Sequence, residues 1–228
     1  MNDDQQALTQ FAGSVRLFPL PNLVLFPQVV SPLHIFEPRY REMTADALAG
    51  DRLIAMALLR PGYEAEYEGK PAVHPIGCVG RIVAEQQRPD GRYDMLLRGI
   101  SRARFGTDLA SGRLYRTVQA KLLYDGPVPD VDAAMALRRE LAERLLPRFH
   151  DKSARDQLQD LFRGELPLGT LCDVLGFALP IPTEEKQVLL ELLDVTRRAE
   201  HLIQQVEALA PAMTAGGDRK FPPDFSSN

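Results

Sequence analysis

The stretch LFPLPNLVLFPQVVSPLHIFEPRYREM, residues 17–43, decides how the first half of the chain folds. It is interrupted by Pro19, Pro21, Pro27 and Pro32. Proline has no N–H to donate and biases the residue before it towards extended geometry, so these prolines exclude a long helix and predict short extended segments. Glu37-Pro38 then predicts the start of a helix, because proline fits the first helical position and an acidic residue suits the positive end of the helix dipole.

Outward from this stretch, the pattern predicts one short helix over 39–49, ended by Gly50, and then a series of strands. The apolar run 53–59 is typical of a strand buried on both faces, although a short helix would also fit. Gly77 and Gly80 indicate a bulge or a close backbone approach, and Pro89-Asp90-Gly91 indicates a hairpin turn. Strands are therefore expected over 53–59, 76–87, 93–105 and 115–124.

From Asp130 onward the spacing of apolar residues changes from about two to about 3.6, which predicts helices. Asp130 is expected to cap the first, and Pro147 to stop it. Further helices are predicted over 152–162, over 167–175, from Thr183, and over 195–209, where one stripe is apolar. The expected organisation is an N-terminal extension (1–13), a β domain with one short helix (14–126), a helical bundle (127–210) and a flexible tail (211–228).

The composition is that of an ordinary globular protein: 228 residues, 45% hydrophobic and 25% charged, with a net charge of −4. The polar, acidic N-terminus predicts neither a secretory signal nor a transit peptide, and no apolar run is long enough to span a membrane. Cys78 and Cys172 lie far apart in sequence and outside any CxxC pattern, which argues against a disulfide framework or a zinc site. We therefore expect a cytoplasmic protein.

Catalytic patterns are weak. Gly99-Ile100-Ser101-Arg102-Ala103 nearly matches the G-x-S-x-G nucleophile elbow, but an elbow needs a strand, a sharp turn and a helix, and this segment continues as a basic extended run. The sequence thus predicts no enzymatic activity and no catalytic residue.

Metal and cofactor patterns are also weak. The four histidines, His34, His74, His150 and His201, are isolated in sequence and form no metal-binding motif. Glu64, Glu66 and Glu68 alternate along an extended segment, which is more typical of a solvated loop than of acid-base chemistry. We expect neither a metal nor a cofactor.

Several motifs together resemble one family. Leu17-x-Pro19-Leu20-Pro21-x-x-Val24-Leu25-Phe26-Pro27, followed by Pro32-Leu33-x-Ile35-Phe36-Glu37-Pro38-Arg39-Tyr40, resembles the opening of the N-terminal domain of Lon proteases, which the Lon-like domain of cereblon shares. Ile76-Gly77-Cys78-Val79-Gly80-x-Ile82 and Arg98-Gly99-x-x-Arg102 resemble the central hairpin of that family. Leu171-Cys172-x-x-Leu175 and Leu189-Leu190-Glu191-Leu192-Leu193-Asp194-Val195 resemble its helical part. The resemblance covers about residues 15–209.

The resemblance implies an α+β fold in which a PUA-like β-barrel precedes an α-helical bundle, in a region that contacts substrate proteins and self-associates. Two departures matter. The sequence contains no GxxxxGK[ST] phosphate loop, which an ATPase module requires, and no Trp, so it cannot form the aromatic cage of the cereblon ligand domain.

The resulting hypothesis is a non-enzymatic module that recognises exposed apolar or unfolded segments of client proteins, as an adaptor, a holdase or a regulator of an ATP-dependent protease. Homo-oligomerisation stays open. Candidate peptide-binding residues are Phe26, Pro27, Phe36, Tyr40 and Met43, at the joins between strand, loop and helix. The alternative for most of these apolar residues is the barrel core. Glu37 and Arg39 are expected to form an internal ion pair.

An RNA-binding role is the alternative hypothesis, because the central hairpin is rich in arginine and arginines can neutralise phosphates. Its candidate residues are Arg92, Arg98, Arg102 and Arg104. Few aromatic residues accompany these arginines, whereas single-strand recognition usually adds stacking rings. A solvated sheet face and intramolecular pairing with the acidic helices is the favoured explanation, so nucleic acid is not an expected partner.

Overall fold

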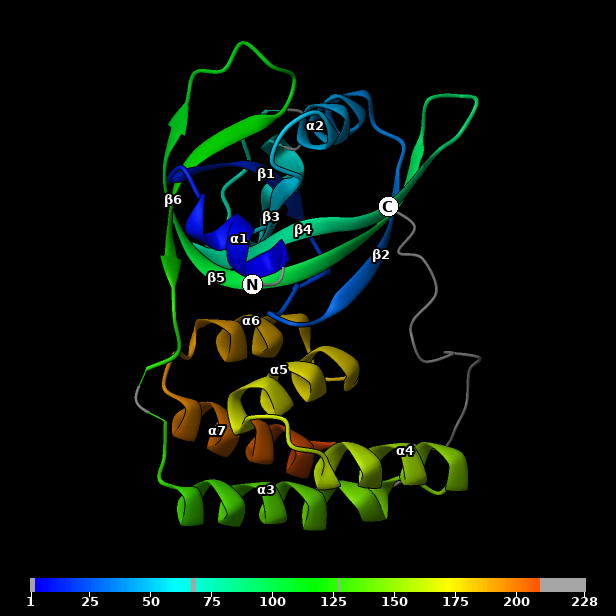
Figure 1. Cartoon of the computed structure of the whole chain (residues 1–228), viewed down its shortest axis with the longest axis vertical. Coiled ribbons are helices and arrows are strands. Elements are labelled where there is room, and N and C mark those ends of the chain that lie inside the picture. The colour runs from blue at the N-terminus through cyan, green and yellow to red at the C-terminus, as the bar shows by residue number, and fades with distance from the viewer. Residues whose placement is uncertain (1–2, 67–68, 127, 210–228) are drawn as a thin grey trace. The chain divides into compact units, whose positions relative to one another are not determined.

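The computed structural model describes residues 3–66, 69–126 and 128–209, and these fall into two compact units, with the boundary in the chain between Leu123 and Tyr124. The first unit holds the strands and the second holds helices alone (Figure 1). The α+β class and the order of barrel and helices expected from the sequence are therefore confirmed. The expected flexible tail, 211–228, lies outside the described residues.

A single six-stranded sheet, in the order β2-β5-β4-β3-β1-β6, forms the first unit. The β5 strand also pairs with β6, which closes β5, β4, β3, β1 and β6 into a barrel and leaves β2 beside the first half of β5. All pairings are antiparallel except that of β1 with β3. The strands are β1 (Ser14–Leu20), β2 (Val30–Ile35), β3 (Leu53–Leu58), β4 (Ile76–Gln87), β5 (Tyr93–Leu109) and β6 (Arg116–Leu123).

The barrel core follows from alternation along the strands. Val15, Leu17, Ala55, Val79 and Val118 belong to one buried cluster inside it. Every residue of β3 is buried, as its uninterrupted apolar run predicts, so a strand and not a helix occupies 53–58.

Short helices accompany the barrel: α1 (Asp3–Thr9), α2 (Pro38–Leu48) and the 3₁₀ turn η1 (Tyr63–Glu66). As predicted, Pro38 occupies the first helical turn of α2, after Glu37 at the N-cap. The expected ion pair is also confirmed, because the Arg39 Nε donates to Glu37 Oε2 at 2.9 Å. The α1 helix was not expected; its residues Ala7 and Leu8, and Phe11 just after it, pack against the barrel core.

Between β1 and β2, the Phe26–Val29 segment of the proline-rich stretch contacts β5 at Gly99. The Gln28 N–H donates to the Gly99 carbonyl and the Gly99 N–H donates to the Val29 carbonyl, both at 2.8 Å. Gln28 takes a positive φ of 64° there. This contact sets the position at which the chain enters β2 and hence the register of β2 on β5.

The second unit contains five α-helices and the 3₁₀ turn η2, within the described residues 124–126 and 128–209. Figure 1 shows α7 running between α3 and α5, and α7 also contacts α6. Asp130 caps α3 as predicted, since its side chain accepts from the Ala133 N–H at 2.8 Å. The elements are α3 (Val131–Leu145), η2 (Leu146–Arg148), α4 (Lys152–Arg163), α5 (Leu168–Ala178), α6 (Thr183–Glu191) and α7 (Val195–Ala208). Across the described residues, none of the helices is both long enough and apolar enough to cross a membrane.

Candidate functional site

The five candidate peptide-binding residues do not form one exposed patch. Phe26 and Met43 have no exposed surface and Tyr40 is only 4% exposed, so these three side chains belong to the core. Tyr40 packs against Phe18 with ring centroids 4.5 Å apart. Pro27 and Phe36 are half-buried and reach the surface. Tyr40 and Met43 lie on the buried face of α2, and Phe26 lies where its carbonyl closely approaches Gly99 of β5.

A different apolar surface lies on β2, β5 and β4. Val30 and Pro32 alternate with buried residues along β2, and Leu96 lies directly opposite Pro32 on β5. Ala84 on β4 lies opposite Leu96 in turn, so the four side chains share one face. Leu96 is 36% exposed, whereas its neighbours Met95 and Leu97 are buried. We name this surface the apolar strip: Val30, Pro32, Ala84 and Leu96.

The sequence analysis missed the apolar strip, although a signal was present. Along β5 the residues Tyr93, Met95 and Leu97 alternate inward, which leaves Leu96 as an apolar residue at an outward position. An outward apolar side chain indicates a contact surface when other apolar side chains adjoin it, as Pro32 and Ala84 adjoin Leu96 here.

One end of the apolar strip is a polar cluster. The Asp94 carboxylate contacts the His34 Nδ1 at 2.7 Å and accepts from the Arg88 Nε at 2.6 Å. The hydrogen bond with His34 holds the pKa of Asp94 below its ordinary value of 3.8, with a smaller contribution from Arg88, although partial burial acts in the opposite direction. The Phe36 ring stacks on His34 with centroids 6.2 Å apart, which places Phe36 beside the strip.

The lowered pKa of Asp94 predicts a pH dependence of stability. A carboxyl with a depressed folded-state pKa stabilises the fold above its unfolded value of 3.8, and this stabilisation is lost as pH falls through the folded value. We expect Asp94→Asn to remove this part of the acid sensitivity, so that stability depends less on pH below about 4. Urea unfolding at a series of pH values measures it. Asp90→Asn, in the turn of the same hairpin, is the control, and an equal change in both variants would contradict the assignment.

The N-terminal helix α1 lies at the other end of the apolar strip. Arg81 and Arg98 lie directly opposite each other on β4 and β5. The carboxylate of Asp4, on α1, accepts from the Arg81 Nε at 2.6 Å and from Arg98 NH1 at 3.4 Å. Asp4 is only 8% exposed. A carboxylate thus bridges two arginines that would otherwise repel each other.

The four candidate RNA-binding arginines are not brought together. Arg92 lies at the start of β5 and Arg104 near its end, a strand path of about 40 Å. Arg92 pairs with Asp90, Arg98 pairs with Asp4, and Arg102 is 3% exposed. The carboxylates that pair with Arg92, Arg98, Arg113 and Arg116 come from the barrel unit and not from the acidic helices as expected. Only Arg104, of these four, is exposed with no ion pair or hydrogen bond to any residue that the structure describes.

The hydrolase-like segment lies in the middle of β5. Ser101 is 5% exposed, and its hydroxyl donates to the carbonyls of Arg102 at 3.0 Å and of Leu123 at 3.3 Å. A strand replaces the sharp turn that a nucleophile elbow needs, so the segment does not present Ser101 as a nucleophile. Within the described ranges no group of three or more His, Cys, Asp or Glu residues could hold a metal ion. Of the three alternating glutamates, Glu68 lies outside the described residues.

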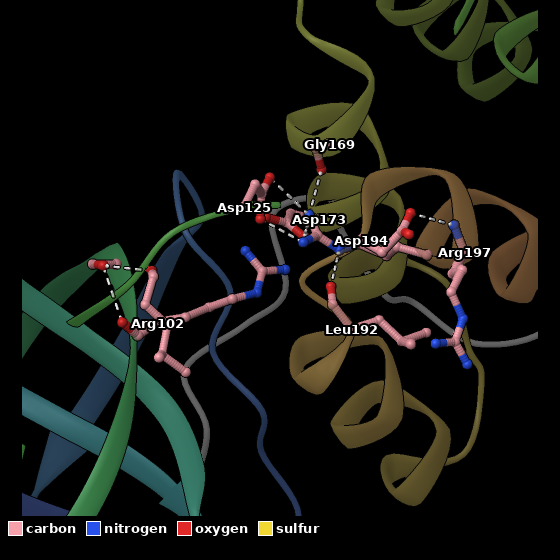
Figure 2. Close-up of polar contacts among 10 residues, drawn as sticks. Arg102, Asp125, Gly169, Asp173, Leu192, Asp194 and Arg197 are labelled. Carbon is pink, nitrogen blue, oxygen red and sulfur yellow. Dashed lines mark hydrogen bonds and ion pairs between the residues drawn. The ribbon is translucent and has the colours of Figure 1, made fainter. Parts of the chain in front are cut away.

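The helical unit contains a polar centre that the sequence analysis did not identify. Arg198 of α7 has no exposed surface and contacts Asp125, Asp173 and two backbone carbonyls. Figure 2 shows Asp125, Asp173 and Gly169 converging on one point, with Leu192 below them. The hydrogen bonds of Arg198 join α7 to α5, to the loop after α6 and to the segment before α3, so the cluster holds the helices of this unit together.

Comparison with known proteins identifies one family. The family model described as the ATP-dependent protease La (LON) substrate-binding domain matches residues 14–208. Lon protease 2 of Herpetosiphon aurantiacus is 26% identical over 211 residues, which cover 89% of this chain and 25% of that protein. The Lon protease of Trichlorobacter lovleyi is 27% identical over 184 residues, covering 80% of this chain and 22% of that one. The chain spans about a quarter of the length of the curated relatives it matches.

Solved structures show the same fold. The N-terminal domain of a Lon protease from the Mycobacterium avium complex superposes with a TM-score of 0.69 at 21% identity, covering 86% of this chain and all of that one, 100%. A Lon N-terminal domain protein from Xanthomonas campestris gives a TM-score of 0.57 at 22% identity over 84% of this chain and 97% of that one. At these identities the structural likeness shows the fold alone.

Proposed function

Because the chain belongs to the Lon substrate-binding domain family, we propose that it is a protein-binding module whose apolar strip contacts exposed apolar segments of unfolded client polypeptides. The proposal assigns binding to the chain and no catalytic step. The observation that carries it is the exposed Leu96, which lies among Val30, Pro32 and Ala84 on a sheet face with polar ends.

The strip favours side-chain contact over strand addition. Among the described strands, β2 pairs only with β5, so its other edge is open. Pro32 in the middle of β2 has no N–H, which weakens that edge as a template for another strand. An apolar client segment would instead lie across the strip. Burial of apolar surface gives roughly 25 cal/mol per Å² before ordering costs, so we expect modest affinity and broad selectivity.

The decisive variant is Leu96→Ser. We expect it to weaken the binding of a permanently unfolded test protein, such as reduced and carboxymethylated lactalbumin, by about tenfold, because burying one leucine contributes roughly 1.5–3 kcal/mol. Fluorescence anisotropy with the intact chain measures the affinity. Val188→Ser is the matched control, since Val188 on α6 is 40% exposed and lies outside the strip. Equal affinity in the parent and in Leu96→Ser would show that the apolar strip does not contact the unfolded protein.

The salt dependence of binding separates this function from RNA binding. Apolar contact predicts an affinity that changes little between low and moderate salt, whereas phosphate contacts predict a steep fall. The unfolded protein and a single-stranded RNA should be titrated side by side at two salt concentrations. Binding of RNA alone would overturn the proposed function.

A further inference from the structure

A second cross-strand pair of cations lies at the far end of β5 from the apolar strip. Arg104 on β5 and Lys121 on β6 are directly opposite each other in the register. Both are exposed, and neither makes an ion pair or hydrogen bond with a residue that the structure describes. Like charges in this arrangement are destabilising, so the pair weakens the barrel that contains it.

The barrel shows what neutralises such a pair. Arg81 and Arg98 are also directly opposite each other, and there the Asp4 carboxylate bridges the two guanidinium groups. Asp4 comes from a separate element, α1, that packs onto the sheet. The Arg104–Lys121 pair has the same cross-strand geometry without the carboxylate.

A pocket of about 360 Å³ lies beside the unpaired cations, with Gly13, Phe105, Gly106 and Gln119 among its lining residues. The register between β5 and β6 shifts from Phe105 to Asp108, so the strand bulges at Gly106. The Gln119 Oε1 accepts from the Thr107 hydroxyl at 3.1 Å, which leaves the Gln119 amide N–H groups available. The pocket therefore combines two cations with an amide donor, whereas the Phe105 ring packs against the barrel core on the opposite face of the strand.

We propose that this pocket, here named the Arg104 pocket, binds a carboxylate of the client polypeptide, from an acidic side chain or the chain terminus. The inference rests on the proposed function and adds a preference for clients in which acidic groups accompany apolar segments. Arg104 and Gln119 would donate charge-assisted hydrogen bonds and Lys121 would supply a second positive charge.

The primary test uses a fluorescein-labelled unstructured peptide of alternating leucine, glycine and glutamate, and a counterpart with glutamine in place of every glutamate. We expect the intact chain to bind the glutamate peptide more tightly. The variant Arg104→Gln/Lys121→Gln should lose about tenfold in affinity for the glutamate peptide and nothing for the glutamine peptide, because each charge-assisted hydrogen bond contributes about 1.5–3 kcal/mol. Its thermal midpoint should be unchanged or raised, since two repelling charges are removed.

Arg60→Gln is the matched control, because Arg60 is an exposed arginine of the same unit that has no hydrogen bond or ion pair through its side chain to any described residue. An equal loss in Arg60→Gln would show general electrostatic attraction and would overturn the proposal. A preference for oligouridylate over both peptides, lost in the double variant, would assign the pocket to nucleic acid instead.

Acetate provides a test that does not depend on client binding. Titration with acetate should shift the backbone amide resonances of Gly106, Gln119 and Lys121 in a saturable way, and the double variant should abolish these shifts. If both peptides bind equally and acetate causes no shift, the Arg104 pocket does not bind carboxylates. If Leu96→Ser still weakens binding in that case, the proposal that the apolar strip binds clients stands. Loss of all peptide binding in the parent chain would instead overturn the proposed function.

Discussion

Replacing Arg198 by methionine is expected to destabilise the helical unit by about 3–5 kcal/mol. Arg198 makes five contacts: its Nε donates to the Leu192 carbonyl at 2.8 Å, NH1 to Asp125, Gly169 and Asp173 at 3.2, 3.4 and 3.2 Å, and NH2 to Asp125 at 2.5 Å. These contacts join the segment before α3, the start of α5, the loop after α6 and α7 itself (Figure 2).

The loss of stability in Arg198→Met comes from the buried polar groups that no longer contact a guanidinium. Asp173 is only 4% exposed at its side chain, so without Arg198 its charge has little solvent to stabilise it. Asp125 is one-third exposed at 33% and loses less. The Leu192 and Gly169 carbonyls also lose a donor. Methionine fills much of the volume of arginine without supplying any of these donors.

Urea unfolding of the intact chain, followed by the helical circular dichroism signal, measures this loss. Arg197→Met is the matched control: Arg197 is the adjacent residue on α7, is exposed, and should change stability by less than about 0.5 kcal/mol. Adding Asp173→Leu to Arg198→Met should recover part of the loss, because a buried carboxylate that has lost the Arg198 guanidinium is then removed. A loss below about 1 kcal/mol in Arg198→Met would contradict a central role for the cluster.

The periodicity of the sequence predicted the helices, and the same pattern contained a sign of this cluster. The stripe Val195, Ala199, Leu202 and Val206 is buried as expected. Arg198 lies within that stripe, three residues after Val195 and four before Leu202. A charged residue on the buried face of a helix requires partners. The sequence could not name those partners, because Asp125 and Asp173 come from segments brought near only by the packing of the helices.

The candidate site was predicted less well than the fold, and the reason is burial. Phe26 and Met43 are apolar residues at segment joins, and sequence alone cannot tell a join that covers the core from one that faces solvent. Leu96 is exposed because Met95 and Leu97 on either side of it point inward, which leaves Leu96 on the outer face between Pro32 of β2 and Ala84 of β4. Exposure of this kind depends on the pairing of β2 with β5, which is a long-range contact.

The roles of the glycines were likewise predicted only in part. Gly77 and Gly80 were predicted to mark a bulge or a close approach, and both are found: the β4–β5 register shifts at Gly80, and a Cβ at Gly77 would lie 2.2 Å from the Met56 carbonyl oxygen. The role of Gly99 was not predicted, because its sequence context resembled a nucleophile elbow. Its partner, the Phe26–Val29 segment, is about seventy residues away in the chain and is recognisable only in the folded barrel.

Gly99→Ala is expected to destabilise the barrel unit by at least about 3 kcal/mol, at the upper end of overpacking costs. A Cβ at this position would lie 2.1 Å from the Phe26 carbonyl oxygen and 2.8 Å from its carbonyl carbon. Both are backbone atoms, so no side-chain rotation relieves the clash. The Cys78 sulfur is a third close neighbour of this Cβ, at 3.0 Å. The segment must shift, and Gly99 exchanges hydrogen bonds with Gln28 and Val29 in that segment.

Thermal unfolding followed by tyrosine fluorescence measures the loss, with Gly106→Ala as the control. Gly106 lies on the same strand, and the nearest atom to a Cβ there is the Gln119 Cβ at 3.4 Å, so a change below about 1 kcal/mol is expected. Because the Gly99 contact sets the register of β2, Gly99→Ala should also weaken client binding through the apolar strip. A stable Gly99→Ala variant with parental client affinity would show that the proline-rich stretch does not set the position of β2.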